Sequence, residues 1–198
     1  MIQGTEQWHD ERGVRLTASR FGDVLAGPET KRRAEYMQEI VWNLRGVPDF
    51  ARDDDKPWHR NGKQWEDHAR GLYEFQTGQD VVQTAFLQHP TIEYVGASPD
   101  GLVTTQGGIE IKCRSSVRAH LASKAKGIPS EHIPQVQGNL WVSGRDWWDF
   151  VSYYRSADGK RSDLHIHRVL PDPAVFKKLE AACAAFWDEV QSRIKQAA

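Results

Sequence analysis

The chain has 198 residues, enough for one domain whose core needs neither a disulfide nor a structural metal. Hydrophobic residues make up 39% and charged residues 27%, which excludes a disordered chain, and no apolar run reaches the ~20 residues of a membrane helix. The 26 basic and 27 acidic residues nearly cancel, so composition alone gives no support for a nucleic-acid ligand. The first residues form neither a basic nor an apolar stretch, so we expect no secretory signal and a cytoplasmic protein.

The spacing of apolar residues predicts helices in the N-terminal third. A short helix capped by Thr17 is expected to point Ala18, Phe21, Val24 and Leu25 inward. Residues 30–45 and 62–75 predict two longer helices, because their apolar side chains recur at helical spacing. The charged stretch 51–60 between them predicts a solvated loop.

The remaining two thirds predict strands, then helices, then strands again. Short runs rich in β-branched residues, separated by glycine and proline, predict strands at 81–87, 92–97, 101–104 and 108–113. Helices follow at 117–126 and 130–142, then strands at 148–154 and 164–170, then a last helix from Asp172 and Pro173. This order predicts an α/β fold with a central mixed sheet flanked by helices, in a single domain over residues 1–198.

The segment that points to chemistry is residues 98–113. Asp100 lies in a turn set by the flanking proline and glycine, and Glu110 and Lys112 alternate with apolar residues on a strand. If the two strands pair, Asp100 and Glu110 lie side by side with the ammonium of Lys112 next to them. Carboxylates are the ligands of Mg²⁺, and two adjacent ones repel unless a cation lies between them. The ammonium can orient a water and stabilise charge on a phosphate, so the set suits phosphodiester hydrolysis.

Each part of this pattern is common by itself. Glu-x-Lys on a half-exposed strand is usually a solvated face, and Asp-Gly usually only makes a turn. Their combination, Pro-Asp-Gly followed after ten positions by Ile-Glu-Ile-Lys, is much rarer. It resembles the PD-(D/E)xK nuclease core.

Six motifs in the same order make the resemblance closer. The chain is similar to the YqaJ-type viral recombinase family, the lambda-exonuclease-like group of phage and prophage recombination exonucleases. The motifs are WHDER (8–12), LTAS (16–19), GKQWEDHAR (62–70), ASPDGL (97–102), IEIKC (109–113) and QVQ (135–137). The resemblance implies a restriction-endonuclease-like core of the PD-(D/E)xK type.

The resemblance also implies roles for residues around a metal centre. Asp100, Glu110 and the backbone carbonyl of Ile111 are implied metal ligands, and Lys112 is implied to position or activate the attacking water. Glu66 matches the family's helical acidic residue near a second metal. Gln137 matches a polar residue that supports the site, whereas Gln135 is the weaker match. The implied cofactor is Mg²⁺, with two ions, and Mn²⁺ is a possible substitute.

A second implied set binds a DNA end. Arg12, Ser19, Ser98 and Arg118 fall where the family forms a pocket for the 5′-terminal phosphate, and guanidinium and hydroxyl groups suit that anion. Local turn or capping bonds are the alternative for the two serines, and a surface charge is the alternative for Arg118. The chain also departs from the family: Glu29 stands where a basic residue probes the downstream duplex. The nearest positive charges are those of Lys31, Arg32 and Arg33.

The function implied by the resemblance is a Mg²⁺-dependent 5′→3′ exonuclease in the cytoplasm of a bacterial host cell. It would digest one strand of linear double-stranded DNA from 5′-phosphorylated ends to mononucleotides, leaving 3′ single-stranded tails for recombination. A ring-shaped homotrimer and a single-strand annealing protein are the implied assembly and partner. The alternatives are a sequence- or structure-specific endonuclease on the same core and a DNA-binding module that no longer cuts. The chain has only two cysteines, which argues against an iron–sulfur nuclease, because a cluster usually takes four.

Overall fold

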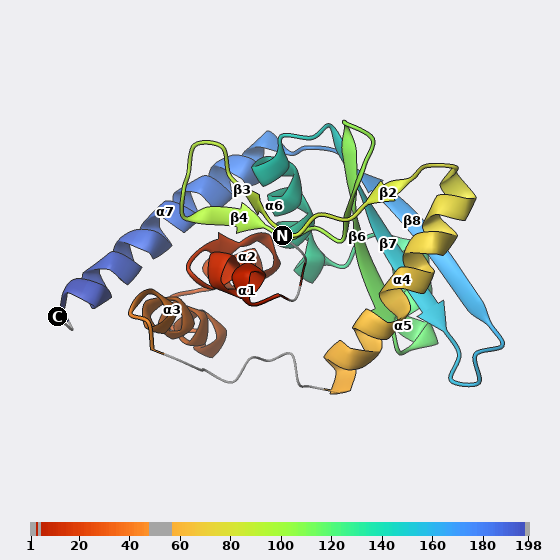
Figure 1. Cartoon of the computed structure of the whole chain (residues 1–198), viewed down its shortest axis with the longest axis horizontal. Helices are drawn as coiled ribbons and strands as arrows, with labels where there is room; N and C mark the ends of the chain where they lie inside the picture. The colour runs from red at the N-terminus through yellow and green to blue at the C-terminus, as the bar shows by residue number, and fades with distance from the viewer. Residues whose placement is uncertain (1–2, 4, 48–56, 197–198) are drawn as a thin grey trace.

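A five-stranded mixed sheet, on the right in Figure 1, is the larger of the two sheets of the fold. The computed structural model describes residues 3, 5–47 and 57–196, without the side chains of residues 57–64. The sheet has the order β2-β5-β6-β7-β8, in which β6 and β7 run parallel and the other neighbours antiparallel. Its strands are β2 (Val81–Val82), β5 (Gly101–Val103), β6 (Gly107–Arg114), β7 (Trp147–Arg155) and β8 (Ser162–Val169). The predicted central mixed sheet is confirmed.

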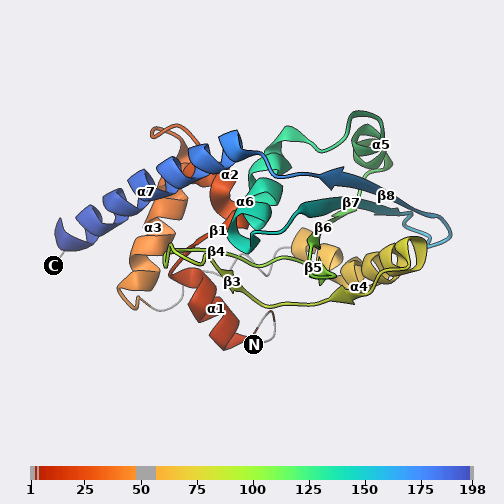
Figure 2. The same ribbon diagram turned by 90° about the horizontal axis from the view of Figure 1, so that it is seen from above.

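Helices cover both faces of this sheet, as Figure 2 shows. On one face α4 (Pro57–Thr77) packs Ala69 and Tyr73 against Ile109 and Ile111 of β6. On the other face lie α5 (Val117–Lys126), a short 3₁₀ turn η3 (Ser130–His132) and α6 (Ile133–Ser143). Side chains alternate between the two faces of a strand. The apolar residues of β6 therefore pack against α4, and Glu110 and Lys112 point toward α6.

Two tryptophans explain the glycines at the start of β6. A Cβ on Gly107 would lie 2.2 Å from the ring of Trp147, and a Cβ on Gly108 would lie 2.4 Å from the ring of Trp148. Both distances are far below van der Waals contact, so only glycine lets β7 pair here. The close pairing fixes the register that sets Glu110 opposite Phe150.

A smaller sheet and an N-terminal helical layer complete the fold. The sheet has the order β1-β4-β3, made of β1 (Leu16–Thr17), β4 (Val95–Ala97) and β3 (Leu87–Gln88). The helices beside it are α1 (Glu6–Gly13), the 3₁₀ turn η1 (Ala18–Arg20), α2 (Phe21–Val24), α3 (Lys31–Leu44) and α7 (Pro173–Gln196). They bury a second core that includes Phe21, Tyr36 and Phe186. Asp172 caps α7 by accepting the amide of Ala174 over 2.9 Å.

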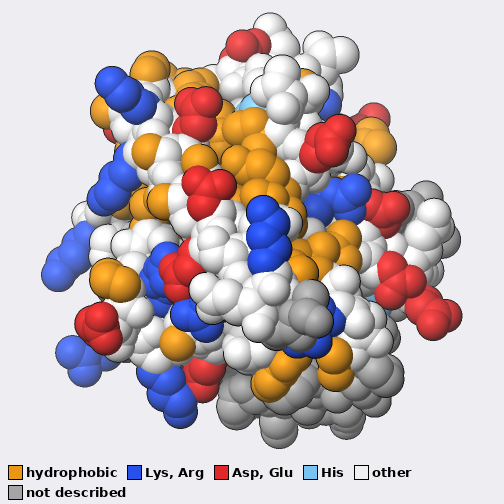
Figure 3. Space-filling model, turned by 90° about the vertical axis from the view of Figure 1, so that its left-hand side faces the viewer, with side chains coloured by type: hydrophobic (Ala, Val, Ile, Leu, Met, Phe, Trp, Pro, Cys, Tyr) orange, Lys and Arg blue, Asp and Glu red, His pale blue; other side chains and the backbone are white. Residues whose placement is uncertain are grey.

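Figure 3 shows the end of the molecule that carries α3 and α7, where hydrophobic side chains gather in a band among charged ones. Tyr94 and Trp187 stack there with ring centroids 4.7 Å apart and an interplanar angle of 7°. A shallow groove lined by Val14, Leu44, Tyr94 and Trp187 runs beside them. No helix within the described ranges is both long and apolar enough to cross a membrane.

Three local predictions differ from the structure. The segment predicted as one strand over 81–87 is divided, because it leaves the large sheet after β2 and joins the small sheet at β3. The helix predicted to start at Thr17 begins instead as strand β1, followed by η1 and α2. Residues 57–60, predicted as loop, are the first turn of α4, while 51–56 lie outside the described residues. Helix α1 has no buried residue, so it lacks the apolar pattern that would have predicted it.

Candidate active site

Asp100 lies just before β5, and Glu110 lies on the neighbouring strand β6 of the large sheet. Gly101 pairs with Ile109 in the antiparallel β5–β6 ladder, which brings Asp100, one residue before β5, beside Glu110. Oδ2 of Asp100 accepts the backbone amide of Ile111 over 2.6 Å. The predicted juxtaposition of the two carboxylates is therefore present.

Glu110 is held in one orientation by three donors. It is 1% exposed, and its Oε1 accepts from Nζ of Lys112 over 2.7 Å and from Nε2 of Gln135 over 2.6 Å. Its Oε2 accepts from Nδ2 of Asn139 over 3.0 Å. A carboxylate has about four acceptor positions, so roughly one remains, on Oε2, for a further ligand.

The charges of this cluster depend on one another. Burial raises the pKa of Asp100 well above its ordinary value, and the nearby Glu110 and Glu66 raise it further. Burial disfavours the charged form of Lys112, but Glu110 and Asp100 outweigh it and raise the pKa of Lys112 above its ordinary value. The ammonium is therefore protonated at neutral pH and acts as a cation rather than a base. A buried and a half-buried carboxylate beside one ammonium form a site that favours a further cation.

Glu66 approaches this cluster from the other face of the sheet. It lies on α4, is close enough to raise the pKa of Asp100, and its Oε1 accepts from Nη2 of Arg70 over 2.7 Å. Among the described residues no three His, Cys, Asp or Glu side chains converge into a ready-made metal cluster. The structure thus brings Asp100 and Glu110 together. Glu66 lies near them and is hydrogen-bonded to Arg70 of its own helix.

Of the two glutamines of α6, the weaker match, Gln135, is the one that contacts Glu110. Gln135 reaches Glu110, whereas Nε2 of Gln137 donates to the carbonyl of Leu170 over 2.9 Å and its Oε1 accepts the amide of Asp172 over 2.9 Å. The expectation that Gln137 supports the site is therefore not met by its contacts. Sequence reasoning also missed Asn139. Its spacing of four from Gln135 is the signal, because residues i and i+4 share one face of a helix.

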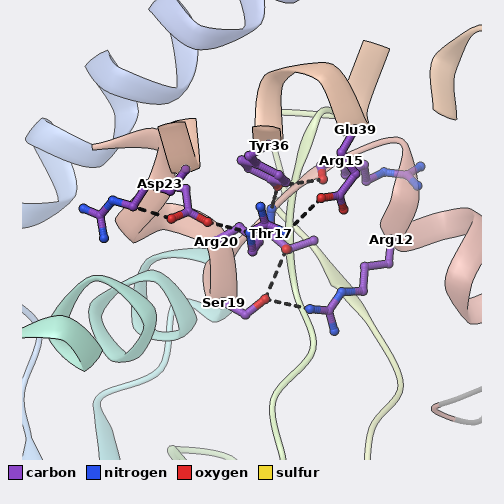
Figure 4. Close-up of polar contacts among 9 residues, drawn as sticks. Arg12, Arg15, Thr17, Ser19, Arg20, Asp23, Tyr36 and Glu39 are labelled. Carbon is purple, nitrogen blue, oxygen red and sulfur yellow. Dashed lines mark hydrogen bonds and ion pairs between the residues drawn. The ribbon is translucent and has the colours of Figure 1, made fainter. Parts of the chain in front are cut away.

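Three of the four residues expected at a DNA end are joined by contacts. Nη2 of Arg12 donates to Oγ of Ser19 over 2.7 Å, and Oγ of Ser19 lies 3.3 Å from Oγ1 of Thr17, as Figure 4 shows. The guanidinium of Arg12 also lies 4.9 Å from the ring centroid of Trp8, and Nε1 of Trp8 donates to Oγ of Ser98 over 3.2 Å. Arg12, Ser19 and Ser98 therefore belong to one polar group beside Asp100.

Arg118 and the basic residues after Glu29 lie elsewhere. Arg118 is exposed in the first turn of α5, and within the described part of the chain it makes no contact with Arg12, Ser19 or Ser98. The three basic residues of α3 all pair with acids: Lys31 with Glu35, Arg32 with Asp23, and Arg33 with Glu189. Arg33 also lies 4.9 Å from the ring centroid of Phe186, so it packs inward against α7.

Most of the chain, including the segments that carry the two carboxylates and Lys112, matches a known family. Residues 7–146 match the model of the YqaJ-like viral recombinase domain. The chain belongs to the YqaJ-like viral recombinase family. All six motifs noted in the sequence lie inside this YqaJ-like domain, including the strand that carries Glu110 and Lys112.

Solved structures of exonucleases are similar to this chain over nearly its whole length. An alkaline exonuclease (LHK-Exo) from Laribacter hongkongensis is 34% identical, with a TM-score of 0.83 over 98% of this chain and 96% of that one. The same exonuclease in complex with dAMP is 33% identical, with a TM-score of 0.82 over 98% and 96% of the two chains. A phage-related exonuclease from Haemophilus somnus 129PT shares the fold, at 15% identity and a TM-score of 0.69 over 94% of this chain and 97% of that one. The fold is thus the PD-(D/E)xK type.

A curated relative is much longer than this chain. The uncharacterized protein R354 of Acanthamoeba polyphaga mimivirus is 26% identical over an alignment of 166 positions that covers 75% of this chain. The aligned region spans only 28% of the mimivirus protein.

Proposed function

We propose that this chain is a Mg²⁺-dependent 5′→3′ exonuclease that degrades one strand of linear double-stranded DNA. It starts from 5′-phosphorylated ends, releases mononucleotides and leaves 3′ single-stranded tails for recombination by single-strand annealing. The observation that carries the proposal is the convergence of Asp100, Glu110 and Lys112 on one point of the sheet. The similarity to an alkaline exonuclease over 98% of the chain supports it.

The donor set suits Mg²⁺. Asp100 and Glu110 would hold the ion through carboxylate oxygens, with the backbone carbonyl of Ile111 as a further oxygen ligand, and hard cations take such ligands. Burial, and after it the charges of Glu110 and Glu66, raise the pKa of Asp100, and a bound cation would offset both effects. Bound there, Mg²⁺ supplies polarisation of the phosphate and a lowered pKa of water. Glu66, near Asp100, is the proposed residue for a second ion, and Mn²⁺ is a proposed substitute.

The chain's own cation completes the chemistry. The ammonium of Lys112 is fixed by Glu110 and stays protonated, so it can orient the attacking water and stabilise negative charge on the phosphate as the bond breaks. Gln135 and Asn139 hold the Glu110 carboxylate in a fixed orientation, so this side chain need not rearrange during the reaction.

The polarity of digestion follows from the group formed by Arg12, Ser19 and Ser98. Ser98 lies two residues before Asp100, so its backbone is at most about 7 Å away. A 5′-terminal phosphate held by the guanidinium and the two hydroxyls would place the adjoining phosphodiester at the carboxylates. Cleavage there removes one nucleotide from the 5′ end. Arg118 remains the proposed fourth donor on the strength of the family resemblance.

The proposal is tested with linear duplex DNA labelled at its 5′ ends. We expect labelled mononucleotides in the presence of Mg²⁺ and none after chelation. Asp100→Ala, Glu110→Ala and Lys112→Ala should each reduce the rate by at least about a hundredfold while the circular dichroism spectrum stays native. Near-wild-type digestion by Lys112→Ala would contradict the mechanism.

Closed circular plasmid separates this function from its alternatives. An exonuclease leaves the plasmid intact, because it offers no end, whereas an endonuclease on the same core nicks it. Binding of duplex without any Mg²⁺-dependent product would show a module that no longer cuts. Either outcome would overturn the proposal.

The family resemblance extends the proposal to assembly and partner. A ring-shaped homotrimer would enclose the duplex, which gives processivity without tight phosphate contacts. The single-stranded 3′ tail would pass to a single-strand annealing protein. Light scattering tests the first point, because a trimer has three times the mass of one chain.

A further inference from the structure

The face of β6 that carries Glu110 and Lys112 continues to Arg114. The three residues are spaced by two, so they point to the same side of the sheet, and the parallel ladder sets them beside Phe150, Ser152 and Tyr154 of β7. The guanidinium carbon of Arg114 lies 5.8 Å from the ring centroid of Phe150. The ring of His132, from η3, lies 5.5 Å from the same centroid. Arg114 and His132 therefore share one aromatic support next to the candidate site.

Both side chains hold buried polar atoms with no partner. Nε and Nη2 of Arg114 and Nε2 of His132 are shielded from solvent and make no hydrogen bond within the described residues. Glu131 acts on Arg114 electrostatically, yet it is exposed and forms no ion pair with it in the described part of the chain. An unpaired buried donor costs free energy, and a guanidinium costs more than an amide. A hydrophobic side chain of similar length could cover Phe150 without that cost.

The atoms left unpaired match one kind of ligand. The Nε and Nη2 atoms of an arginine form a planar fork that fits two oxygens of a phosphate, and an imidazole N–H can add a third bond. Lys112, two positions away on the same face, adds a positive charge, which its ion pair with Glu110 partly offsets. The neighbouring carboxylates are those proposed to hold Mg²⁺, so the anion at hand is the DNA backbone.

We propose that Arg114 and His132 form a subsite for an internal backbone phosphate adjacent to the one that is cleaved. This inference rests on the proposed nuclease function and adds positioning residues outside the six shared motifs. Two residues of a strand span about 7 Å, so the subsite lies one step along β6 from Lys112. By fixing the neighbouring phosphate, the subsite sets where the scissile bond lies relative to the carboxylates.

The salt dependence of DNA binding tests the subsite. Binding is measured by fluorescence anisotropy on duplex with 5′-hydroxyl ends, in chelator, so that neither the terminal phosphate nor cleavage contributes. Because each neutralised phosphate adds about 0.9 to the slope of log K against log salt, Arg114→Met should reduce the slope by about 0.9 and weaken binding about tenfold. Arg114→Lys should keep the slope, because it keeps the charge, but bind more weakly than wild type. Arg193→Met, which removes an exposed arginine near the end of α7, should leave both quantities unchanged.

Stability and a second variant distinguish a binding role from a structural one. Arg114→Met removes unpaired buried donors and should not lower the unfolding midpoint. His132→Phe keeps a ring against Phe150, loses Nε2, and should weaken binding by about threefold. An unchanged slope in Arg114→Met would overturn the subsite even if wild type digests DNA. Absence of Mg²⁺-dependent digestion by wild type would instead overturn the proposed function.

Discussion

Gln135 donates its side-chain amide to Oε1 of Glu110 over 2.6 Å, while Gln137, two residues later on the same helix, turns away from that carboxylate. Gln137 instead bridges the carbonyl of Leu170 and the amide of Asp172, at the junction of β8 and α7. One helix therefore serves the candidate site with one glutamine and the fold with the other. The two can be separated by experiment, and each is the control for the other.

Gln135→Ala should impair catalysis and spare stability. It frees the Glu110 carboxylate to move, and loss of a group that orients a metal ligand typically costs 10–100-fold in metal affinity or activity. Gln137→Ala should do the reverse, lowering the free energy of unfolding by about 1–2 kcal/mol through two lost hydrogen bonds. Mg²⁺ titration calorimetry, the rate of mononucleotide release and urea unfolding measure the three quantities. Equal effects of the two variants on activity would contradict the assignment.

The position of the carboxylates could be predicted because it depends on local rules. Alternation along β6 assigns Glu110 and Lys112 to one face, and the Pro-Asp-Gly turn brings Asp100 beside Glu110. Both rules act within about a dozen residues, so no knowledge of the rest of the fold is needed. The same holds for α7, whose apolar stripe and Asp172 cap are confirmed.

The features that could not be predicted depend on how distant elements pack. The rotation of α6 about its axis determines which of its two glutamines reaches Glu110. The QVQ motif has a glutamine at each end, so the sequence does not distinguish the two. The division of 81–87 between two sheets follows from pairings with β5 and β4, which lie later in the chain. The partnerless atoms of Arg114 and His132 can only be recognised once burial is known.

Asp100→Asn should stabilise the protein while abolishing cleavage. Burial, and after it the charges of Glu110 and Glu66, raise the pKa of Asp100 above the ordinary value of 3.8. At pH values between 3.8 and the raised pKa, the native state therefore binds more protons than the unfolded state. Stability contributed by this group therefore falls as pH rises through that window. The asparagine keeps an acceptor for the amide of Ile111 without the charge. We expect the unfolding midpoint to rise by about 2–4 °C at pH 8, with the gain shrinking as pH falls toward 3.8.

Added Mg²⁺ provides the second half of this test. A ligand that binds only the native state raises the midpoint in proportion to its affinity, so Mg²⁺ should stabilise wild type and leave Asp100→Asn unchanged. Scanning calorimetry of both proteins with and without Mg²⁺ measures the shift. A lower midpoint for Asp100→Asn in chelator would show that the carboxylate stabilises the fold and does not strain it.

Arg12→Ala should remove the preference for phosphorylated ends. Its guanidinium is the only fully charged member of the group it forms with Ser19 and Ser98, so it is expected to supply most of the attraction for a terminal phosphate. Wild type should digest 5′-phosphorylated duplex at least about tenfold faster than 5′-hydroxyl duplex, and Arg12→Ala should digest the two equally. Initial rates on both substrates measure the ratio, and Arg193→Ala should retain it. Equal wild-type rates on the two ends would exclude the pocket.

Tyr73→Phe should weaken the fold without touching the candidate site. The hydroxyl of Tyr73 donates to Oδ2 of Asp149 over 2.8 Å, and Arg168 donates to both oxygens of the same carboxylate over 2.9 Å. Asp149 is 1% exposed and pairs with Ile109, on the face of the sheet opposite Glu110. Removing one donor from a buried carboxylate costs about 1.5–3 kcal/mol, which urea unfolding will measure.

The matched control for this variant is Tyr154→Phe. The hydroxyl of Tyr154 makes no hydrogen bond within the described chain, so its removal should change the free energy of unfolding by less than about 0.5 kcal/mol. Nuclease activity per folded molecule should stay at the wild-type level in Tyr73→Phe, because the lost bond lies on the far side of β6 from the carboxylates. A fall in activity with no loss of stability would mean that Asp149 communicates with the site through the sheet.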